Sequence, residues 1–482
     1  MSISQSLNNA VSGLTATSRM AEVVSSNLSN ALTEGYARRV LDTSSASIGG
    51  QGAGVRIDGV RRISDPGLVG DRRLADAALA AQTRLSDTVA RLEAQFSAPD
   101  DPAGLGGRVA ALEQALVTAG ADPASDQRLG VVVNRLNEVT AVLQQNARDV
   151  QSMRQTADAD IARDVGNLNT ALKQVEQLNA DISRARITGG DPSALMDERQ
   201  RAIDRIGEIV TVREVARPND QLALITTSGL QLLDGPAMQF EFSQTPTITA
   251  FMTLASGGLS GVTRDGVPLD PTDGFGKLSG GSLAASFAAR DTNLVAAQTA
   301  LDEVAADLIT RFADPTVDPT LGPTDAGLLT DAGGTHDPLD IVGLSRRIAV
   351  NAAVDPAQGG ALFRVRDGVN AIAAGPIGDA TQIDRWGQAL SSAQTIGGGI
   401  PALSAVGQIA RVAAQFGTER VQLDEAVTFA AARRDTLYQA ELAEGVDTDQ
   451  ELQMLLRIEQ AYGANAKLMQ TINAMIQTLM EI

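Results

Sequence analysis

Residues 3–31 read ISQSLNNAVSGLTATSRMAEVVSSNLSNA, and their apolar members recur at alternating spacings of three and four. This is the a/d pattern of a coiled-coil helix, in which one narrow apolar stripe faces a partner. The stripe consists of Ile3, Leu7, Ala10, Leu14, Thr17, Ala21, Val24, Leu28 and Ala31. The pattern predicts an amphipathic helix that needs a second helix beside it.

The other end of the chain carries the same pattern, in Leu455, Ile458, Tyr462, Asn465, Met469, Ile472, Ile476 and Leu479. Two stripes this narrow bury little surface, so two such helices alone are marginally stable. We expect the two ends to pair with each other and to gain further apolar neighbours from other subunits, although a bundle core within one subunit is the alternative. The predicted assembly interface between subunits is Ile3, Leu7, Leu14, Val24, Leu28, Leu455, Ile458, Tyr462, Met469, Ile472, Ile476 and Leu479.

The middle of the chain is helical, then β-rich, then helical again. No proline interrupts the helical spacing between Pro123 and Pro192, which predicts about 55 residues of helix and a rod of roughly 80 Å. Further helices are predicted after Asp65-Pro66 and Asp191-Pro192, and at 282–313 and 402–443. The short runs QLALIT, QFEF and TITAFMTL, separated by turn signals, predict a small antiparallel β domain.

These patterns predict a mainly α fold with an inserted β domain: a discontinuous long-helix bundle whose N- and C-terminal helices pair as a coiled coil, plus a small antiparallel β domain. Residues 314–400 are rich in Asp, Pro and Gly, and the only stretches there with a β-like or helical pattern are SRRIAVN and ATQIDRWGQAL. The predicted units are 1–62 with 441–482, 63–210 with 277–315 and 400–440, 211–276, and a loop-rich 316–399.

Composition excludes several classes of function. The 482 residues carry a net charge of −19, which argues against binding to nucleic acid. The chain has no cysteine, so disulfides, thiol nucleophiles and cysteine-based metal sites are excluded. No apolar stretch is long enough to cross a membrane, and the uncharged first 18 residues do not resemble a secretory signal.

Candidate chemical sites are weak. His336 is the only histidine and lies in a predicted loop, where it is more often a surface residue than a base. The aspartates between 314 and 340 lack the spacing of a calcium-binding loop. Gly49, Gly50, Gly52 and Gly54 are not followed by the Lys and the helix of a phosphate-binding loop, so we expect a flexible loop there. The sequence therefore predicts no catalytic, cofactor-binding or metal-binding residue.

The stretch NLSNALTEGYARR, residues 27–39, ends the first stripe. We expect Gly35 to adopt the left-handed conformation that closes this helix, and Tyr36 to fold back onto the helix end.

Several segments resemble the flagellar axial proteins. Asn27, Asn30, Gly35, Tyr36 and Arg38 are similar to the family's Asn-rich helix end followed by GYxR. Leu195-Met196-Asp197-Glu198-Arg199 resembles its LLDxR stretch, and Gly280-Gly281-Ser282-Leu283 with Arg290-Asp291 resembles its GGxL helix start. Gly445-Val446-Asp447, Glu451, Leu455, Gln460-Ala461-Tyr462 and Ala464-Asn465-Ala466 resemble its C-terminal pattern. The two internal segments point to the hook-associated members of the family, because hook and rod proteins share mainly the two ends.

The resemblance implies a non-enzymatic structural subunit of the bacterial flagellum that joins hook to filament. It implies secretion through the flagellar export apparatus without a cleaved signal, an extracellular location, and ordering of the ends during assembly. Implied partners are hook protein, a second hook-associated junction protein, a cytoplasmic chaperone at the C-terminal helix, and further copies of the chain in a ring. Tyr36 would mark a hinge, and Arg38 and Arg39 would meet carboxylates of neighbouring subunits. The alternatives are a hook or rod subunit, or a secreted adhesin or enzyme carried on axial-type ends.

Overall fold

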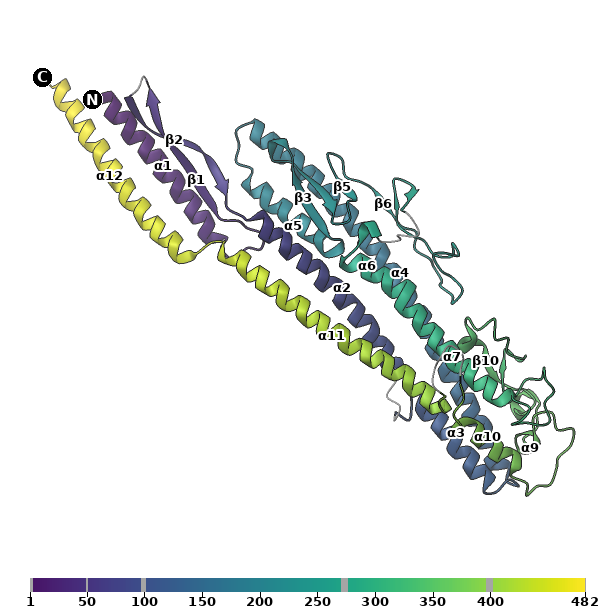
Figure 1. The fold of residues 1–482 in the computed structure, drawn as a ribbon. Coiled ribbons are helices and arrows are strands. Elements are labelled where there is room, and N and C mark those ends of the chain that lie inside the picture. The colour runs from purple at the N-terminus through teal and green to yellow at the C-terminus, as the bar shows by residue number, and fades with distance from the viewer. Residues whose placement is uncertain (1–2, 49–50, 97–100, 270–275, 396–401, 482) are drawn as a thin grey trace.

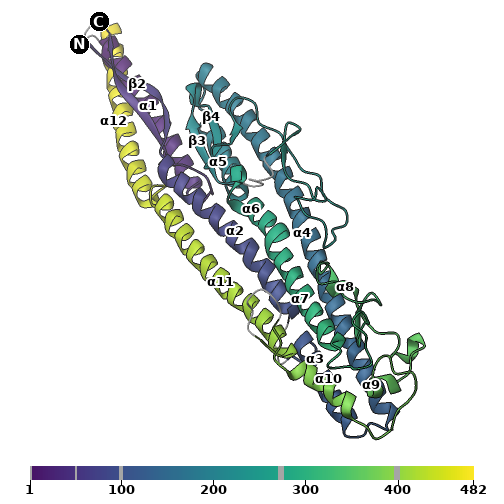
Figure 2. The same cartoon turned by 45° about the vertical axis from the view of Figure 1, so that its right-hand side comes forward.

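A computed structural model describes residues 3–48, 51–96, 101–269, 276–395 and 402–481. The molecule is a long rod, and the N- and C-terminal helices reach the same tip (Figures 1 and 2). Long helices run along the rod, while strands and loops lie along one side and at the far end (Figure 1). The predicted class, mainly α with inserted β structure, is confirmed.

The helices are α1 (Ile3–Ser29), α2 (Pro66–Phe96), α3 (Leu105–Gly120), α4 (Asp126–Ile187), α5 (Ser193–Ile209), α6 (Gly281–Ala288), α7 (Leu294–Ala313), α8 (Leu344–Arg347), α9 (Phe363–Asp367), α10 (Thr381–Ser391), α11 (Ala405–Ala443) and α12 (Thr448–Met480). The strands are β1 (Arg39–Ile48), β2 (Gln51–Arg62), β3 (Val212–Ala216), β4 (Leu222–Thr226), β5 (Gln231–Leu233), β6 (Phe240–Glu241), β7 (Thr263–Arg264), β8 (Val267–Pro268), β9 (Leu329–Asp331) and β10 (Ile348–Val350). The strands pair antiparallel, β1 with β2, β9 with β10, and in two three-stranded sheets ordered β3-β4-β5 and β6-β7-β8.

The longest helix forms where the proline-free stretch predicts it. α4 runs unbroken for 62 residues, which at about 1.5 Å per residue corresponds to roughly 93 Å. Ser125 caps its beginning, because the serine side chain accepts a hydrogen bond from the backbone N–H of Arg128. α4 therefore forms the backbone of the rod, with α3, α5, α6 and α7 packed along it.

Two apolar cores share α4. The first packs the beginning of α4 with α3, α7, α10 and the start of α11, and includes the rings of Phe312 and Trp386, which meet edge to face at 5.6 Å. The second packs the later part of α4 with α5, α6 and strands β3 to β6. Both cores rest on Leu, Val, Ile and Ala, as the low aromatic content of the chain requires.

The terminal helices continue the rod beyond the bundle. α1 lies beside α12, and α11 lies beside α2 (Figure 1).

Asp65 begins α2 as predicted, because its Oδ1 accepts hydrogen bonds from the backbone N–H groups of Gly67 at 2.7 Å and Leu68 at 3.3 Å.

The expected flexible loop around the glycines is wrong for Gly52 and Gly54, which lie in strand β2; Gly49 and Gly50 lie outside the described residues. The β1–β2 hairpin packs along α1. The backbone N–H of Val55 donates to Ser12 Oγ at 3.1 Å, and Gln5 Nε2 donates to the carbonyl of Gly52 at 3.1 Å. Small side chains let this hairpin approach the helix closely.

Gly54→Ala is expected to separate the hairpin from α1. Gly54 has a φ of +96°, and a Cβ there would lie 2.0 Å from Ser12 Oγ. Strain and collision together should destabilise the local structure by about 1–3 kcal/mol, measurable as faster amide exchange in β2. Gly52→Ala is the control, because a Cβ at Gly52 meets nothing within 4 Å. Equal exchange in the two variants would contradict the close packing.

The predicted continuous helix over 282–313 is wrong in one detail. A π-helical segment, η4 (Ala289–Asn293), separates α6 from α7. This widened turn contains Arg290, whose side chain is fully buried and donates to Asp158 at 2.5 Å, and whose guanidinium lies over the ring of Phe287 at 4.9 Å. The interruption thus coincides with a buried charge that must reach α4.

Candidate functional site

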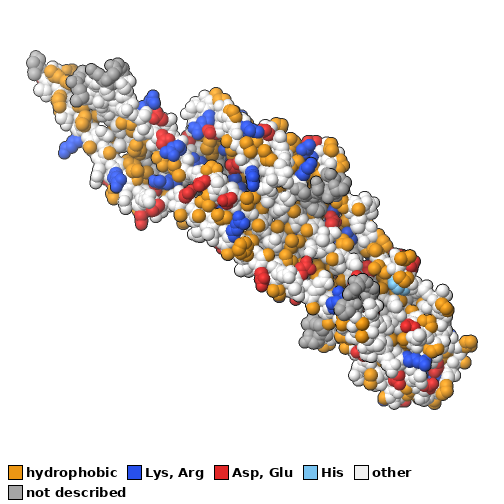
Figure 3. All heavy atoms as spheres, viewed as in Figure 1, with side chains coloured by type: hydrophobic (Ala, Val, Ile, Leu, Met, Phe, Trp, Pro, Cys, Tyr) orange, Lys and Arg blue, Asp and Glu red, His pale blue; other side chains and the backbone are white. Residues whose placement is uncertain are grey.

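The chain passes from the terminal helices and their β1–β2 hairpin into the bundle at residues 63–65, and returns to α12 at residues 444–447. The turn at residues 30–38, between α1 and β1, lies beside the first passage, because the backbone N–H of Ile63 donates to the carbonyl of Arg38 at 2.8 Å. The two passages lie at the same level of the rod (Figure 1). Basic and acidic side chains mingle over this region of the surface (Figure 3).

The first helix ends earlier than predicted, at Ser29 rather than at Gly35. Asn30 closes the last turn, since its Nδ2 donates to the carbonyl of Ser26 at 2.9 Å. Gly35 is left-handed as expected, with a φ of +74°, but it closes the turn that follows the helix. A Cβ at Gly35 would lie 2.7 Å from Cγ of Arg201, so glycine allows this turn to approach α5.

Asn27, near the end of α1, uses every hydrogen-bonding group of its side chain. It is 1% exposed. Its Oδ1 accepts from Tyr36 Oη at 2.8 Å and from the backbone N–H of Arg39 at 3.0 Å. Its Nδ2 donates to the carbonyl of Arg39 at 2.9 Å and to Glu451 Oε2 at 3.2 Å. One side chain therefore connects α1, the start of β1 and α12.

Tyr36 folds back onto the end of α1, as the sequence predicts. Besides its bond to Asn27, its hydroxyl lies 3.3 Å from Ser26 Oγ. Burial raises the pKa of Tyr36 above its usual value, so the phenol stays a hydrogen-bond donor at neutral pH. The guanidinium of Arg39 covers its ring at 4.8 Å.

Arg38 and Arg39 meet carboxylates within the chain, whereas their expected contacts with neighbouring subunits stay a prediction. Arg38 Nε donates to Glu451 Oε1 at 2.7 Å, and Arg39 Nη2 donates to Asp197 Oδ2 at 2.7 Å, both within the chain. The sequence could not show these partners, because they lie 413 and 158 residues away.

Asp197 connects the same region to α5. Its Oδ1 accepts from Arg62 Nε at 2.6 Å and from the backbone N–H of Ala37 at 3.4 Å. Asn27, Tyr36, Arg38, Arg39, Arg62, Asp197 and Glu451 form one continuous set of contacts, called here the joint network. Three segments that resemble the flagellar family, around residues 27–38, 195–199 and 445–451, thus meet at one place.

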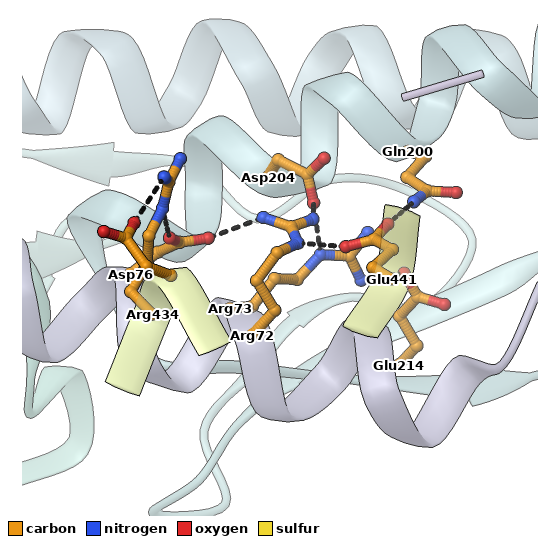
Figure 4. A network of polar contacts seen from close by, with 9 residues as sticks. Arg72, Arg73, Asp76, Gln200, Asp204, Glu214, Arg434 and Glu441 are labelled. Carbon is orange, nitrogen blue, oxygen red and sulfur yellow. Dashed lines mark hydrogen bonds and ion pairs between the residues drawn. The ribbon is translucent and has the colours of Figure 1, made fainter. Parts of the chain in front are cut away.

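The joint network continues into a second cluster, centred on Arg72 of α2 (Figure 4). Arg72 donates to Asp76 at 2.5 Å, to Asp204 at 2.8 Å and to Glu441. Gln200 donates to Glu441 at 3.2 Å and accepts from Arg62 of the joint network. Burial opposes the charge of Arg72, but the carboxylates of Asp204 and Glu441 raise its pKa above the usual arginine value.

Arg73 extends this cluster to the β-rich region. Its Nε donates to Asp204 Oδ1 at 2.6 Å, and its Nη1 donates to Glu214 of β3. The cluster therefore holds α2, α5, α11 and β3 together just inside the joint (Figure 4).

The structure brings the predicted terminal stripes side by side, but α1 covers only part of α12. Ile458 and Ile472 of α12 and Val24 of α1 are each 5% exposed, in two helices that pack against each other. Asn465 packs against Gly13, where a Cβ would lie 2.9 Å from its Nδ2. Among the remaining stripe residues, the half-buried ones are Ile3, Leu7, Leu14, Leu455, Met469 and Ile476, and the exposed ones are Leu28, Tyr462 and Leu479.

A second apolar surface on α12 was missed by the sequence analysis. Met454, Leu468 and Met475, at spacings of 14 and 7 residues and therefore on one side of the helix, are between 42% and 50% exposed and are called here the outer face. Leu452, Leu456 and Met480 are also exposed, on other sides of the helix. Figure 3 shows apolar side chains at this end of the rod. A count of apolar residues beside the a/d stripe would have found it, because α12 is apolar over more than one stripe. An exposed apolar face of this kind marks a protein contact.

An open pocket of about 650 Å³ lies between α2, α4, α5 and α6, and its lining includes the polar residues Arg84, Arg163, Asp164, Gln174 and Glu208. Ser282 Oγ donates to Asp164 Oδ2 at 2.8 Å. Burial raises the pKa of Asp164, while the Ser282 hydroxyl and two arginines oppose this.

Asp164→Asn is expected to raise the unfolding midpoint at pH 7–8. A carboxyl whose pKa is higher in the folded state loses stability as pH rises through that value, and the neutral amide avoids the loss. The gain should be no more than about 1 kcal/mol and should shrink as pH falls toward the unfolded value of 3.8. Asp160→Asn is the control, because it removes a carboxylate that pairs with Arg84 and Arg163 and should lower the midpoint. A gain for Asp164→Asn that is independent of pH would contradict this explanation.

The other residues considered as chemical candidates lie in loops and turns. His336 lies in a loop, and burial lowers its pKa. Asp314 and Asp318 accept backbone N–H bonds in turns, from Thr316 and Thr320. Among the described residues, no group of three or more acidic or histidine side chains could hold a metal ion. None of the described helices has a stretch long and apolar enough to span a membrane.

Three family models match the chain. Residues 89–315 match the flagellar hook-associated protein FlgK helical domain, residues 7–36 match the flagella basal body rod protein family, and residues 442–482 match the flagellar basal body rod FlgEFG protein C-terminal family. The last two matches cover α1 and α12, and the first covers most of the bundle.

Among curated proteins, flagellar hook-associated protein 1 of Salmonella typhimurium and that of Salmonella typhi are each 24% identical over 273 residues, or 53% of this chain and 48% of the relative. The chain thus spans about half the length of these relatives. Among solved structures, the flagellar hook junction protein FlgK from Burkholderia pseudomallei superposes with a TM-score of 0.46 at 17% identity, over 55% of this chain and 47% of that one. In its helical domain and at both ends, the chain is thus similar to the flagellar hook-associated proteins.

Proposed function

We propose that the chain is a structural subunit that joins hook to filament by self-assembly through α1 and α12. The observation that carries this proposal is the outer face of α12, which is apolar and exposed although α12 is paired with α1. A lone helix pair with an apolar outer surface gains most when further helices cover that surface. The subunit needs no catalytic group to do this.

The family matches support the junction over other axial positions. The terminal matches are to rod-type families, which fits any axial subunit, whereas the helical-domain match over 89–315 is specific to the hook-associated type. The Salmonella relatives carry the name flagellar hook-associated protein 1. This combination favours a junction subunit over a hook or rod subunit.

The partners follow from this proposal. We infer contacts with hook protein on one side, a second hook-associated junction protein on the other, and further copies of this chain in a ring. A cytoplasmic chaperone would cover the exposed face of α12 before export, and the working location would be the extracellular flagellum. Residues 1–62 with 441–482 would face the axis, the long helices would form the surrounding layer, and 211–276 would face outward.

The test replaces two outer-face residues with charges. Leu468→Glu with Met475→Glu should abolish incorporation into flagella in cells that lack their own junction protein, leaving hooks without filaments in electron micrographs. The physical reason is that two buried, unpaired carboxylates in an apolar interface cost several kcal/mol. The matched control is Gln470→Glu with Gln477→Glu, which adds the same charge at exposed polar positions of the same helix.

Normal filaments with the Leu468→Glu, Met475→Glu chain would overturn the proposed interface. Loss of filaments with both pairs of substitutions would show that charge on α12, rather than the outer face, matters.

A further inference from the structure

The packing of α12 in the single chain is uneven along its length. Of its 33 residues, the buried ones are Glu451, Ile458 and Ile472. Burying an isoleucine stabilises the helix in proportion to the apolar area removed from water, whereas ordering the backbone costs conformational entropy at every residue. Two isoleucines therefore hold α12 only weakly over most of its length.

The beginning of α12 is held differently. Glu451 is 1% exposed and lies in the first turn, where the helix N-terminus favours a negative charge. Its carboxylate accepts one bond from Arg38 at 2.7 Å and one from Asn27 at 3.2 Å. Bonds of this charged kind are about twice as strong as neutral ones. Asp447 caps the same turn by accepting from the backbone N–H groups of Asp449 and Gln450.

The same residues fix α1 and the bundle. Asn27 belongs to α1, and Arg39, Arg62 and Asp197 continue the contacts to α5. The joint network is thus the one place among the described residues where α12, α1 and the bundle share a continuous set of polar contacts.

We propose that the joint network is the fixed end from which α12 pairs with α1. The first turns of α12 are ordered on α1 in the separate subunit, and order decreases toward Met480 until a second copy covers the outer face. The part about the second copy rests on the proposed function. Fixing one end in advance lowers the ordering cost of assembly, because each further turn adds to an existing helix.

The experiment measures amide exchange in the full-length, separate subunit. In the unmodified chain, amides near 451–459 should be protected and amides near 468–480 should exchange at least 10-fold faster. Arg38→Gln leaves a buried carboxylate with only Asn27 as a donor and should speed exchange near 451–459 by at least 10-fold, while α4 is unchanged. Glu451→Gln removes the buried charge and keeps the shape, so it should give a smaller increase at the same place.

Arg38→Gln with Glu451→Gln should be less affected than Arg38→Gln alone, because no unpaired carboxylate remains. Arg19→Gln and Glu459→Gln are the controls, since both side chains are exposed and should change nothing. Unchanged exchange near 451–459 in Arg38→Gln and Glu451→Gln, or uniform exchange along α12 in the unmodified chain, would overturn the proposal. If Arg38→Gln also speeds exchange in α4, the Glu451→Gln chain alone tests the proposal, and unchanged exchange near 451–459 in that chain would overturn it.

The two proposals can fail separately. The Leu468→Glu, Met475→Glu chain should lose assembly with unchanged protection near 451–459, and the Arg38→Gln chain should lose that protection with an intact outer face. If Arg38→Gln does not speed exchange near 451–459 but the Leu468→Glu, Met475→Glu chain fails to assemble, the joint proposal is wrong and the assembly interface stands. If the exchange effect is seen but the Leu468→Glu, Met475→Glu chain assembles normally, the assembly interface is wrong and the joint proposal stands.

Discussion

A chain carrying Gly281→Ala is expected to lose about 4 kcal/mol of its free energy of unfolding. Gly281 begins α6 with a φ of +72°, and a Cβ there would lie 2.3 Å from the carbonyl oxygen of Ile209 and 2.8 Å from the backbone N of Val210. Neither backbone atom can move without displacing the end of α5. The loss should appear as a lower midpoint in denaturation followed by helical circular dichroism.

Gly189→Ala separates the two causes of this loss. Gly189 has a φ of +76° but no atom within 4 Å of its hypothetical Cβ. It therefore reports backbone strain alone, which should cost about 1 kcal/mol. Equal losses at Gly281 and Gly189 would show that the contact between α5 and α6 has room for a methyl group.

Arg290→Met is expected to lower the free energy of unfolding by about 3–5 kcal/mol, because it leaves a buried carboxylate unpaired. Arg290 and Asp158 are both fully buried and form an ion pair at 2.5 Å. Arg290 also donates to Asp291 at 2.8 Å and to the carbonyl of Ser260 at 3.1 Å. Chemical denaturation of the purified chain measures the effect.

Arg61→Met is the matched control, since the Arg61–Asp42 pair is exposed and should contribute little to stability. Asp158→Asn combined with Arg290→Met should recover part of the loss, because residue 158 then carries no unpaired charge. If Arg290→Met costs no more than Arg61→Met, the pair contributes no more when buried than when exposed.

Regular patterns made the helical part of the fold predictable. α4 repeats its apolar spacing over many turns without a proline, and the terminal stripes keep strict heptad spacing. The hairpin of β1 and β2 could not be predicted in the same way, because its Ser- and Gly-rich strands have no alternating apolar face. Its position depends on close approach to α1 at Gly54. Helix α3 was also missed, because Gly106 and Gly107 weaken the helical signal at its start.

The candidate site was only half predictable. Heptad spacing placed Ile458 and Ile472 in the apolar stripe of α12, and local turn chemistry placed Tyr36 on the helix end. The carboxylates that meet Arg38 and Arg39 follow no periodicity and come from distant segments, so the chain itself supplied partners that were expected from a neighbour. Polar networks depend on the finished packing, which one sequence does not reveal.

The contact between Asn27 and Glu451 joins positions 424 residues apart. When a chain emerges N-terminus first, whether from a ribosome or from a narrow pore, α1 appears long before the residue that fixes it. α4 and α5 lie next to each other in sequence and can fold early, while closing the long loop between Asn27 and Glu451 is slow. The joint is therefore expected to be among the last contacts to form, and its closure would signal that everything between the two helices has already emerged.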